Sequence, residues 1–399
     1  MKIAPLFLAA LLIAIPQVRA AGQEPGSWSI AMADTIMKRN PGTPQDSLAQ
    51  WSYWKGYTLN GFEMLWRSTG ERRYFDFIQR EVDPFIDANG NLVHVEINNL
   101  DNTMAGNIVV GLYEHTHDVR YRNAANAIRR TFDTYPRNAD GGFWHSRRLP
   151  GEMWVDGVFM GQMFLLRYGQ VIGDREYCFD EVTRQITLFA SHARKDESGL
   201  YYHAWAEKPQ LATVVGERKV QWADPRTGLS SEVWSEGLGW YALVVVETLA
   251  DLPKEHPRRT AVLDIYRRLA ADLKQTQDPR TGGWFLVVDK GARPDNWIDN
   301  SGSAMFTYTL QRGIDLGLLD SKEYAPVVAS GYKAIAANAK IDNKGLVDIY
   351  SACDGLCVQA NYADYVHCKK SVNAKEAVAG FLWATTIVEK PTAAAIGRR

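Results

Sequence analysis

The feature of this sequence that most constrains its fold is a repeated pair of helical patterns. The first pattern of each pair is apolar and contains small residues, as at 154–169 and 234–250, whereas the second is charged on one side. Apolar residues recur at spacings of three and four, the period of a helix with one buried face. The spacing predicts about twelve helices, at roughly 27–38, 47–68, 72–87, 102–116, 118–134, 154–171, 174–194, 234–250, 256–277, 300–317, 321–338 and 373–389.

Short loops with glycine beside aromatic residues separate the pairs, for example at 141–146 and 281–288. No run of alternating strands accompanies them. These features favour an all-α fold, an (α/α)6 barrel with apolar helices in an inner ring and charged helices in an outer ring. An open solenoid is the alternative, but it would need capping ends and more uniform repeats.

The N-terminus has the pattern of an export signal. Lys2 precedes an apolar run over 3–16, and Val18-Arg19-Ala20 resembles a small-residue cleavage site. We expect a signal peptide over 1–20, one catalytic domain over 21–390 and a flexible tail over 391–399, in a secreted or periplasmic protein. No later segment is apolar enough to span a membrane, so we expect no membrane partner after signal removal.

Charge and cysteine content narrow the possible partners. Lys and Arg total 45 against 46 for Asp and Glu, which argues against a nucleic acid or an anionic membrane surface. Three of the four cysteines, Cys353, Cys357 and Cys368, lie close together, and export permits one disulfide among them with undetermined pairing. Zinc is a weaker alternative, because only His367 lies near them. The sequence gives no indication of oligomeric state.

The barrel prediction also places a site. All inner helices of such a toroid run the same way, so their N-terminal ends gather at one mouth. The predicted helix openings carry acidic and aromatic side chains: Trp51, Tyr53, Asp101, Asp156, Trp234, Glu236, Trp297 and Asp299. A pocket lined by carboxylates and tryptophan rings is the site hypothesis that follows.

Asp156 and Asp101 are the candidate acid pair. Each also reads as a helix N-cap, which is the commoner use of Asp at a helix start. Against this, Trp154 and Val155 before Asp156 already resemble helix or mouth-lining residues. Two carboxyls from different elements facing one sugar suit glycoside chemistry. The one that acts as an acid must be protonated, so burial or a neighbouring charge should raise its pKa.

Other residues near the predicted mouth allow two interpretations. His203 is either a packed loop histidine or a site residue. Arg147 and Arg148 are either a solvated pair or a fork that binds a substrate carboxylate. His145 lies in the same loop as the two arginines. The sequence contains no glycine-rich phosphate loop, nucleophile-elbow serine or HExxH motif.

Several long segments resemble the unsaturated rhamnogalacturonyl hydrolases of glycoside hydrolase family 105. They are LYYHAWAE, then QWADPRTGLSSEVWSEGLGWYALVVVETLADLP and SGSAMFTYTLQRGIDLGLLD, together with WSYWKGYTLNGFEMLWRSTG and MWVDGVFMG. The resemblance runs from about residue 45 to about residue 390. It implies an (α/α)6 barrel that removes a terminal 4,5-unsaturated uronic acid from oligosaccharides left by a polysaccharide lyase, most directly unsaturated galacturonyl-rhamnose from pectin.

The resemblance also implies residue roles and a mechanism. The enol-ether double bond is hydrated: an Asp protonates C4, water adds at C5, and the resulting hemiketal opens and releases the sugar. The general acid/base of the family falls on Asp156, while Asp101 would position water or substrate and favour the protonated form of Asp156. Positions that line the family's subsites fall on Tyr53, His145, His203, Trp234 and Trp240. No metal or other cofactor is required.

The sequence departs from the family pattern where substrate is recognised. Glu236 stands where the family usually has Arg, Ser146 replaces a basic residue after the pocket His, and CDGLCVQANYADYVHC replaces a glycine-rich loop. Glu236 would repel a uronate unless Arg147 or Arg148 compensates or Glu236 points away. The same chemistry on unsaturated glucuronyl oligosaccharides is therefore an alternative. A sugar isomerase or epimerase and a non-catalytic sugar-binding homologue are less favoured.

Overall fold

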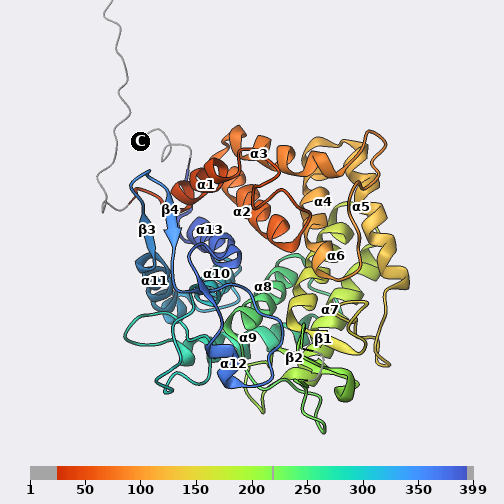
Figure 1. Cartoon of the computed structure of the whole chain (residues 1–399). Coiled ribbons are helices and arrows are strands. Elements are labelled where there is room, and N and C mark those ends of the chain that lie inside the picture. Colours follow the sequence, from red (N-terminus) through yellow and green to blue (C-terminus); the bar gives the residue numbers. More distant parts are fainter. Residues whose placement is uncertain (1–24, 218–219, 393–399) are drawn as a thin grey trace, which may run out of the picture.

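Six helices form a closed ring at the centre of the structure (Figure 1). They are α2 (Tyr53–Thr69), α4 (Met104–Thr116), α6 (Val155–Val171), α8 (Ser235–Asp251), α10 (Asn300–Asp315) and α13 (Lys375–Glu389). Each packs on the next in chain order, and α13 packs on α2. The closure of this ring in the computed structural model confirms the (α/α)6 barrel and rules out the open solenoid.

The structure describes residues 25–217 and 220–392. The predicted signal peptide over 1–20 lies outside the described residues, as does all but the first part of the tail predicted over 391–399. Among the helices that the structure does describe, none is long and apolar enough to cross a membrane.

An outer helix packs on each inner one. The outer helices are α1 (Trp28–Arg39), α3 (Arg72–Val82), α5 (Val119–Thr131), α7 (Arg175–Ala193), α9 (Arg259–Thr276) and α11 (Ser321–Ala337). They pack on α13, α2, α4, α6, α8 and α10 respectively. In α3, for example, Phe77 and Ile78 are buried while Arg72 and Asp76 remain exposed. This one-sided burial follows the amphipathic pattern in the sequence.

Small residues let the inner helices approach closely. A Cβ at Gly56 of α2 would lie 2.6 Å from the main-chain carbonyl of Met104 in α4. A Cβ at Gly302 of α10 would likewise lie 2.6 Å from Cβ of Ser235 in α8. Since neither distance is possible for a real side chain, the small residues noted in the apolar patterns are required for the ring to close.

Caps and turns that the apolar spacing does not show set where some predicted helices begin. The segment predicted at roughly 47–68 begins only at Tyr53, because the Ser52 side chain accepts a hydrogen bond from the Lys55 main-chain N–H and caps α2. The segment predicted from about residue 102 is preceded by a 3-10 turn, η2 (Asp101–Thr103), which leads into α4.

Short elements between the helices escaped the sequence prediction. Three two-stranded antiparallel sheets join β1 (Glu152–Trp154) to β2 (Ala204–Ala206), β3 (Ala339–Ile341) to β4 (Val347–Ile349), and β5 (Ala352–Cys353) to β6 (Lys370–Ser371). The remaining elements are α12 (Tyr362–Val366), η1 (Asp83–Phe85), η3 (Phe132–Thr134) and η4 (Pro209–Leu211). Segments this short are too brief for an apolar pattern to repeat along them.

The predicted disulfide is absent, and all four cysteines are free thiols. Cys353 lies in β5, where its thiol is hydrogen-bonded to that of Cys368, and Cys357 is exposed on the loop between them. The segment 353–368 is held in place instead by the β5–β6 pairing and by a small apolar cluster around Tyr365 and Trp234.

Candidate active site

The N-terminal ends of the inner helices meet at one mouth, as the barrel prediction requires. Tyr53 is the first residue of α2, and Asp101 lies in the turn before α4. Asp156, Glu236 and Glu376 each occupy the first turn of α6, α8 and α13. Asp299 is the N-cap of α10. Helix N-termini favour negative charge, so the fold concentrates carboxyls at this mouth.

Asp156 does not cap its helix. Trp154 occupies the N-cap position of α6 without a side-chain capping bond. Asp156 Oδ2 instead lies 3.1 Å from His203 Nε2, and His203 Nδ1 lies 2.8 Å from the Tyr365 hydroxyl. The side chain of His203 is fully buried, whereas 14% of that of Asp156 is exposed. The Asp156 carboxyl is therefore the partly exposed end of a hydrogen-bonded series whose other members, His203 and Tyr365, are buried.

A short sheet brings His203 to Asp156. Strand β1 pairs with β2, and the main-chain N–H of Val155 donates to the carbonyl of His203 at 3.0 Å. His203 precedes β2 directly and Asp156 follows β1, so the two side chains are set opposite one another. The histidine is thus both a packed loop residue and a neighbour of the candidate acid.

Asp101 has a histidine neighbour of its own. Its Oδ2 lies 3.7 Å from His145 Nε2, and the His145 ring stacks on Trp154 with centroids 4.4 Å apart and planes at 6°. Burial raises the pKa of Asp101, the negative charge of Asp156 adds to this, and His145 opposes it. The raised pKa thus falls on Asp101, to which the resemblance gives a positioning role, and the raised pKa expected of the acid itself stays a prediction.

Two polar atoms in this region have no protein partner. Asp101 Oδ1 and His145 Nδ1 are buried without a hydrogen bond to any described residue. The capping interpretation of Asp101 is also wrong, because its side chain makes no cap bond to η2 or α4. Buried polar atoms normally find partners, so both atoms are available to water or a ligand.

The predicted aromatic residues lie behind these carboxyls. Trp234 packs on His203 with ring centroids 4.6 Å apart, and Trp240 packs between Tyr57 and Phe159, 4.7 Å from each ring. Both tryptophans are only 1% exposed. They support the site from behind in this structure, and their contact with substrate stays a prediction.

Arg147 takes no place among the carboxyls. Its guanidinium lies 4.8 Å from the ring centroid of Tyr135, and Nη1 donates to the carbonyl of Thr134 at 3.4 Å. Arg148 is exposed, and its main-chain N–H bonds to Ser146. The idea that either arginine offsets Glu236 therefore has no support in the described contacts.

The sequence analysis did not predict two residues of this site, Glu376 and Tyr365. The Tyr53 hydroxyl donates to Glu376 Oε1 at 2.5 Å, and Tyr365 supports His203. Glu376 had the same signal as Asp156, an acid in the first turn of an inner helix. Tyr365 had none, because it lies in the five-residue helix α12 of the unusual C-terminal block.

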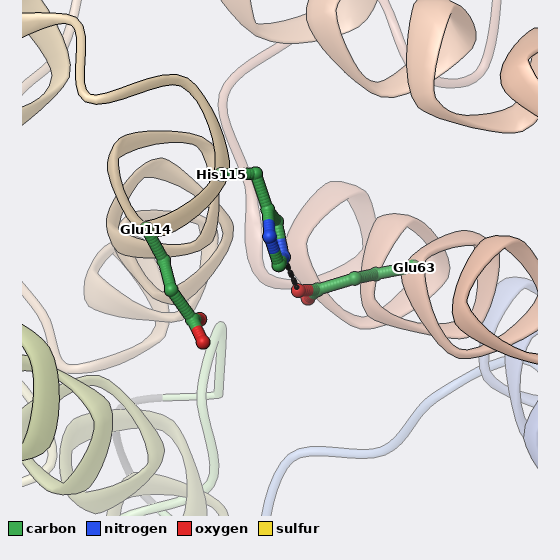
Figure 2. A group of neighbouring side chains, drawn as sticks. All are labelled: Glu63, Glu114 and His115. Carbon is green, nitrogen blue, oxygen red and sulfur yellow. Dashed lines mark hydrogen bonds and ion pairs between the residues drawn. The ribbon is translucent and has the colours of Figure 1, made fainter.

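Only one group among the described residues has the spacing of metal ligands, and it lies elsewhere. Glu63, Glu114 and His115 gather at the C-terminal ends of α2 and α4 (Figure 2). Arg167 Nη2 already lies 2.5 Å from Glu63 Oε1 and 2.8 Å from Glu114 Oε2, and Arg67 Nη2 lies 3.0 Å from His115 Nε2. Because guanidinium groups take the position of a cation, these residues do not fit a metal.

The sequence model of glycosyl hydrolase family 88 matches residues 28–392. The chain belongs to this family. An unsaturated rhamnogalacturonyl hydrolase of Bacillus subtilis is 26% identical over 342 residues, which is 84% of this chain and 87% of the relative. A family 105 glycoside hydrolase of C. acetobutylicum superposes with a TM-score of 0.84 at 28% identity, covering 92% of this chain and 100% of that structure.

A more distant structure shows the same fold. The unsaturated glucuronyl hydrolase of Bacillus sp. GL1 has a TM-score of 0.66 at 15% identity, covering 90% of this chain and 95% of that structure. Membership of family 88 makes this protein a glycoside hydrolase. The predicted resemblance to family 105 is confirmed by the C. acetobutylicum structure.

Proposed function

We propose that this family 88 hydrolase removes a terminal 4,5-unsaturated uronic acid from lyase-generated oligosaccharides, with unsaturated galacturonyl-rhamnose as its first substrate. The observation that carries the proposal is the Asp156 carboxyl at the barrel mouth, held by His203 and Tyr365 and accompanied by Asp101. The relatives named for unsaturated uronyl substrates support the substrate class.

The proposed reaction is a hydration. The Asp156 carboxyl gives its proton to C4 of the double bond, and a water molecule adds its oxygen to C5. The carboxylate left on Asp156 takes the proton that the water loses, which restores the acid. The hemiketal at C5 then opens to a ketone and leaves a hemiacetal at C1, which breaks down to an aldehyde and the free leaving sugar.

The two carboxyls have different surroundings, which suits different roles. Asp156 has a fixed partner in His203, which holds the carboxyl in one orientation. Asp101 has one oxygen near His145 and the other without a described partner. We assign Asp101 to the positioning of water or substrate.

The test is to supply unsaturated uronyl disaccharides made by lyases and to follow the loss of ultraviolet absorbance of the conjugated double bond. We expect loss of absorbance together with release of one reducing sugar for each bond consumed. Absorbance that persists with every uronyl disaccharide would refute the hydration. Parallel arms with galacturonyl-rhamnose and glucuronyl substrates compare the first candidate with the second.

The second candidate substrate is an unsaturated glucuronyl oligosaccharide. Glu236 favours it, because this side chain lies at the mouth where the resemblance leads one to expect Arg. A change at a position that faces substrate suits a change in sugar preference. Higher kcat/KM on the glucuronyl arm would select this candidate.

Export is part of the same proposal. The pattern in residues 1–20 supports a secreted or periplasmic enzyme, which would meet its polysaccharide fragments outside the cytoplasm. Mass spectrometry of the protein recovered from its native host should show a mature chain that begins at about residue 21. A chain that retains Met1 would contradict export through this signal.

A further inference from the structure

The segment 353–368 contains three of the four cysteines and also supports the candidate acid. Its Tyr365 hydroxyl lies 2.8 Å from His203 Nδ1, and His203 Nε2 lies 3.1 Å from Asp156 Oδ2. The position of the Asp156 carboxyl therefore depends on how firmly this segment is held. The cysteines at its two ends are thiols that the proposed hydration does not use.

Cys353 and Cys368 lie on the same face of the sheet formed by β5 and β6. Cys353 pairs with Lys370, so these two side chains share a face. The main-chain N–H of Asp354 donates to the Lys369 carbonyl at 3.0 Å, which extends the pairing toward Cys368. Side chains alternate between the faces of a strand. Cys368, two residues before Lys370, is therefore on the face of Cys353.

The two thiols also share one packing environment. The apolar cluster around Trp234 and Tyr365 includes buried Cys353 and half-buried Cys368. Within it the Cys353 thiol is hydrogen-bonded to the Cys368 thiol. Two contacting thiols on one face of a sheet can be joined with little movement of the backbone.

The other two cysteines are placed differently. Cys357 is exposed on the loop that connects β5 to α12, whereas Cys353 is 0% exposed. Cys178 lies in α7, on the main core of the barrel, where its Cβ is 2.6 Å from the position that a Cβ of Gly169 would take. Of the pairings that the sequence leaves open, the structure thus favours Cys353 with Cys368.

We propose that Cys353 and Cys368 are a redox pair, and that oxidation joins them in a disulfide which stabilises the segment 353–368. The structure shows the reduced state of this pair. A bond between the two ends of the segment closes a loop and restricts the unfolded chain. In the folded chain it ties down the segment that places Tyr365 against His203. The pair does not depend on the proposed hydration.

The oxidant is a low-molecular-weight disulfide such as oxidised glutathione. The Cys368 thiolate, which is half-buried, attacks one sulfur of this disulfide and releases the first small thiol. The Cys353 thiol then gives its proton to solvent, and its sulfur attacks that of Cys368 and releases the second small thiol. Two protein thiols are oxidised and one small disulfide is reduced to two thiols. Cys353 reacts second because it is 0% exposed.

The first test identifies the bond in the full chain after reduction, removal of the reductant and treatment with oxidised glutathione. Chymotrypsin cuts after Leu356 and Tyr365, so the three cysteines of the segment fall into separate peptides. Mass spectrometry should find the Cys353 peptide linked to the Cys368 peptide. A link that includes Cys357 would overturn the proposal, as would glutathione retained on Cys368 with Cys353 still free, or no reaction at either residue.

Thiol counting in variants gives an independent measure. Cys357→Ser removes the exposed thiol, which could itself bind glutathione, and leaves three of the four thiols. Its count under denaturing conditions should fall from three to one on oxidation. The double variant Cys357→Ser/Cys368→Ser is the matched control and should keep both of its thiols. Equal losses in the two variants would overturn the pairing.

The second test measures the effect of the bond. Oxidation should raise the Tm by about 4 °C in the wild type and in Cys357→Ser, and dithiothreitol should reverse the rise. Cys368→Ser should show no shift. Chymotrypsin should also cut the native oxidised chain after Leu356 more slowly than the reduced chain. An unchanged Tm on oxidation would refute the stabilising role. Since neither readout involves turnover, both stand or fall separately from the hydration.

Discussion

The two mouths of the barrel use the same residue types in opposite ways. At the N-terminal mouth, Glu236 and Glu376 contact hydroxyl groups and no cation. At the C-terminal mouth, Glu63 is bound by Arg167 through both oxygens, at 2.5 and 2.6 Å, and Arg312 binds Glu247 at 3.0 Å. The carboxyls of one mouth are hydrogen-bonded to neutral hydroxyl groups, and those of the other are paired with guanidinium groups.

This difference distinguishes carboxyls that could give up a proton from carboxyls that are fixed in ion pairs. Arg167 holds the pKa of Glu63 far below its usual range although burial opposes this, so that carboxylate is permanently charged and cannot deliver a proton. A carboxyl without a cation, like Glu236, has a pKa that rises with burial. Pairing with a guanidinium, and not burial alone, thus decides in which direction the pKa of a carboxyl moves.

The C-terminal mouth also holds a cavity, which does not by itself indicate an active site. A cavity of about 610 Å³ opens at the C-terminal ends of the inner helices, lined in part by Glu63, Arg167, Glu247 and Arg312. Its main carboxylates are already paired. The presence of a cavity is not enough, because the proposed reaction also needs a carboxyl that is free to give up a proton.

The largest expected effect is at the N-terminal mouth. Asp156→Asn keeps the shape of the side chain but removes the acid, so we expect kcat to fall by roughly 10²–10⁴-fold while substrate still binds. Initial rates of absorbance loss and calorimetric binding of the unsaturated disaccharide measure the two quantities.

The same substitution at the other mouth gives the control. Asp251→Asn, at the end of α8, should keep wild-type rates. If Asp156→Asn turned over at the wild-type rate, Asp156 would not be the acid, and the contrast between the mouths would lose its functional meaning.

The second prediction concerns removal of a buried ion pair at the C-terminal mouth. Arg167→Leu leaves Glu63, whose side chain is 7% exposed, without its main cation. Removing one partner of a buried ion pair costs about 3–5 kcal/mol of unfolding free energy. Without Arg167, burial would raise the pKa of Glu63, and the carboxyl would take up a proton at acid pH. The loss of unfolding free energy should therefore be smaller at acid pH than at neutral pH. Urea denaturation at two pH values measures both effects.

Arg72→Leu is the comparison for this variant, since Arg72 and Asp76 form an ion pair with side chains 71% and 57% exposed. It should change the unfolding free energy by less than about 1 kcal/mol. Equal losses in Arg167→Leu and Arg72→Leu would show that the buried network is not what stabilises the C-terminal mouth. The kcat of the folded Arg167→Leu enzyme should match that of the wild type.

The ring and its mouth were predictable because they depend on local periodicity. Apolar spacing located all twelve helices of the two rings, and the common direction of the inner helices placed Asp101 and Asp156 at one end. Tyr365 was not predictable, because it reaches His203 across 162 residues from a helix too short to have a pattern. Such contacts are set by tertiary packing alone.

The contacts of the acidic residues at the mouth were also beyond the sequence. Glu236 raised the question of repulsion, and in the structure its described hydrogen bond is to Ser301, which lies between Glu236 and Asp299. The neighbouring glutamate, Glu376, lies far along the chain, in α13. The absent disulfide has a related cause, since clustering in sequence does not determine whether thiols are oxidised.

The last prediction concerns an unpaired carboxyl beside the candidate acid. Glu152 in β1 is 1% exposed and accepts a hydrogen bond from Trp154 Nε1 at 2.7 Å. Burial raises the pKa of Glu152 from 4.5 to about 7. Between these values the unfolded chain has lost its proton while the folded chain still holds it. Stability therefore falls as pH rises through this window.

Glu152→Gln should remove this pH-dependent loss, because the amide keeps an oxygen for Trp154 but cannot ionise. A change of about 2.5 pKa units corresponds to about 3 kcal/mol. The variant should gain up to this amount over the wild type at about pH 8 and little at about pH 4. Glu255→Gln, at an exposed position, should show no such gain. Equal gains at both pH values would mean that Glu152 is not held neutral. Carboxyls beside the N-terminal mouth would then tolerate charge as those at the C-terminal mouth do.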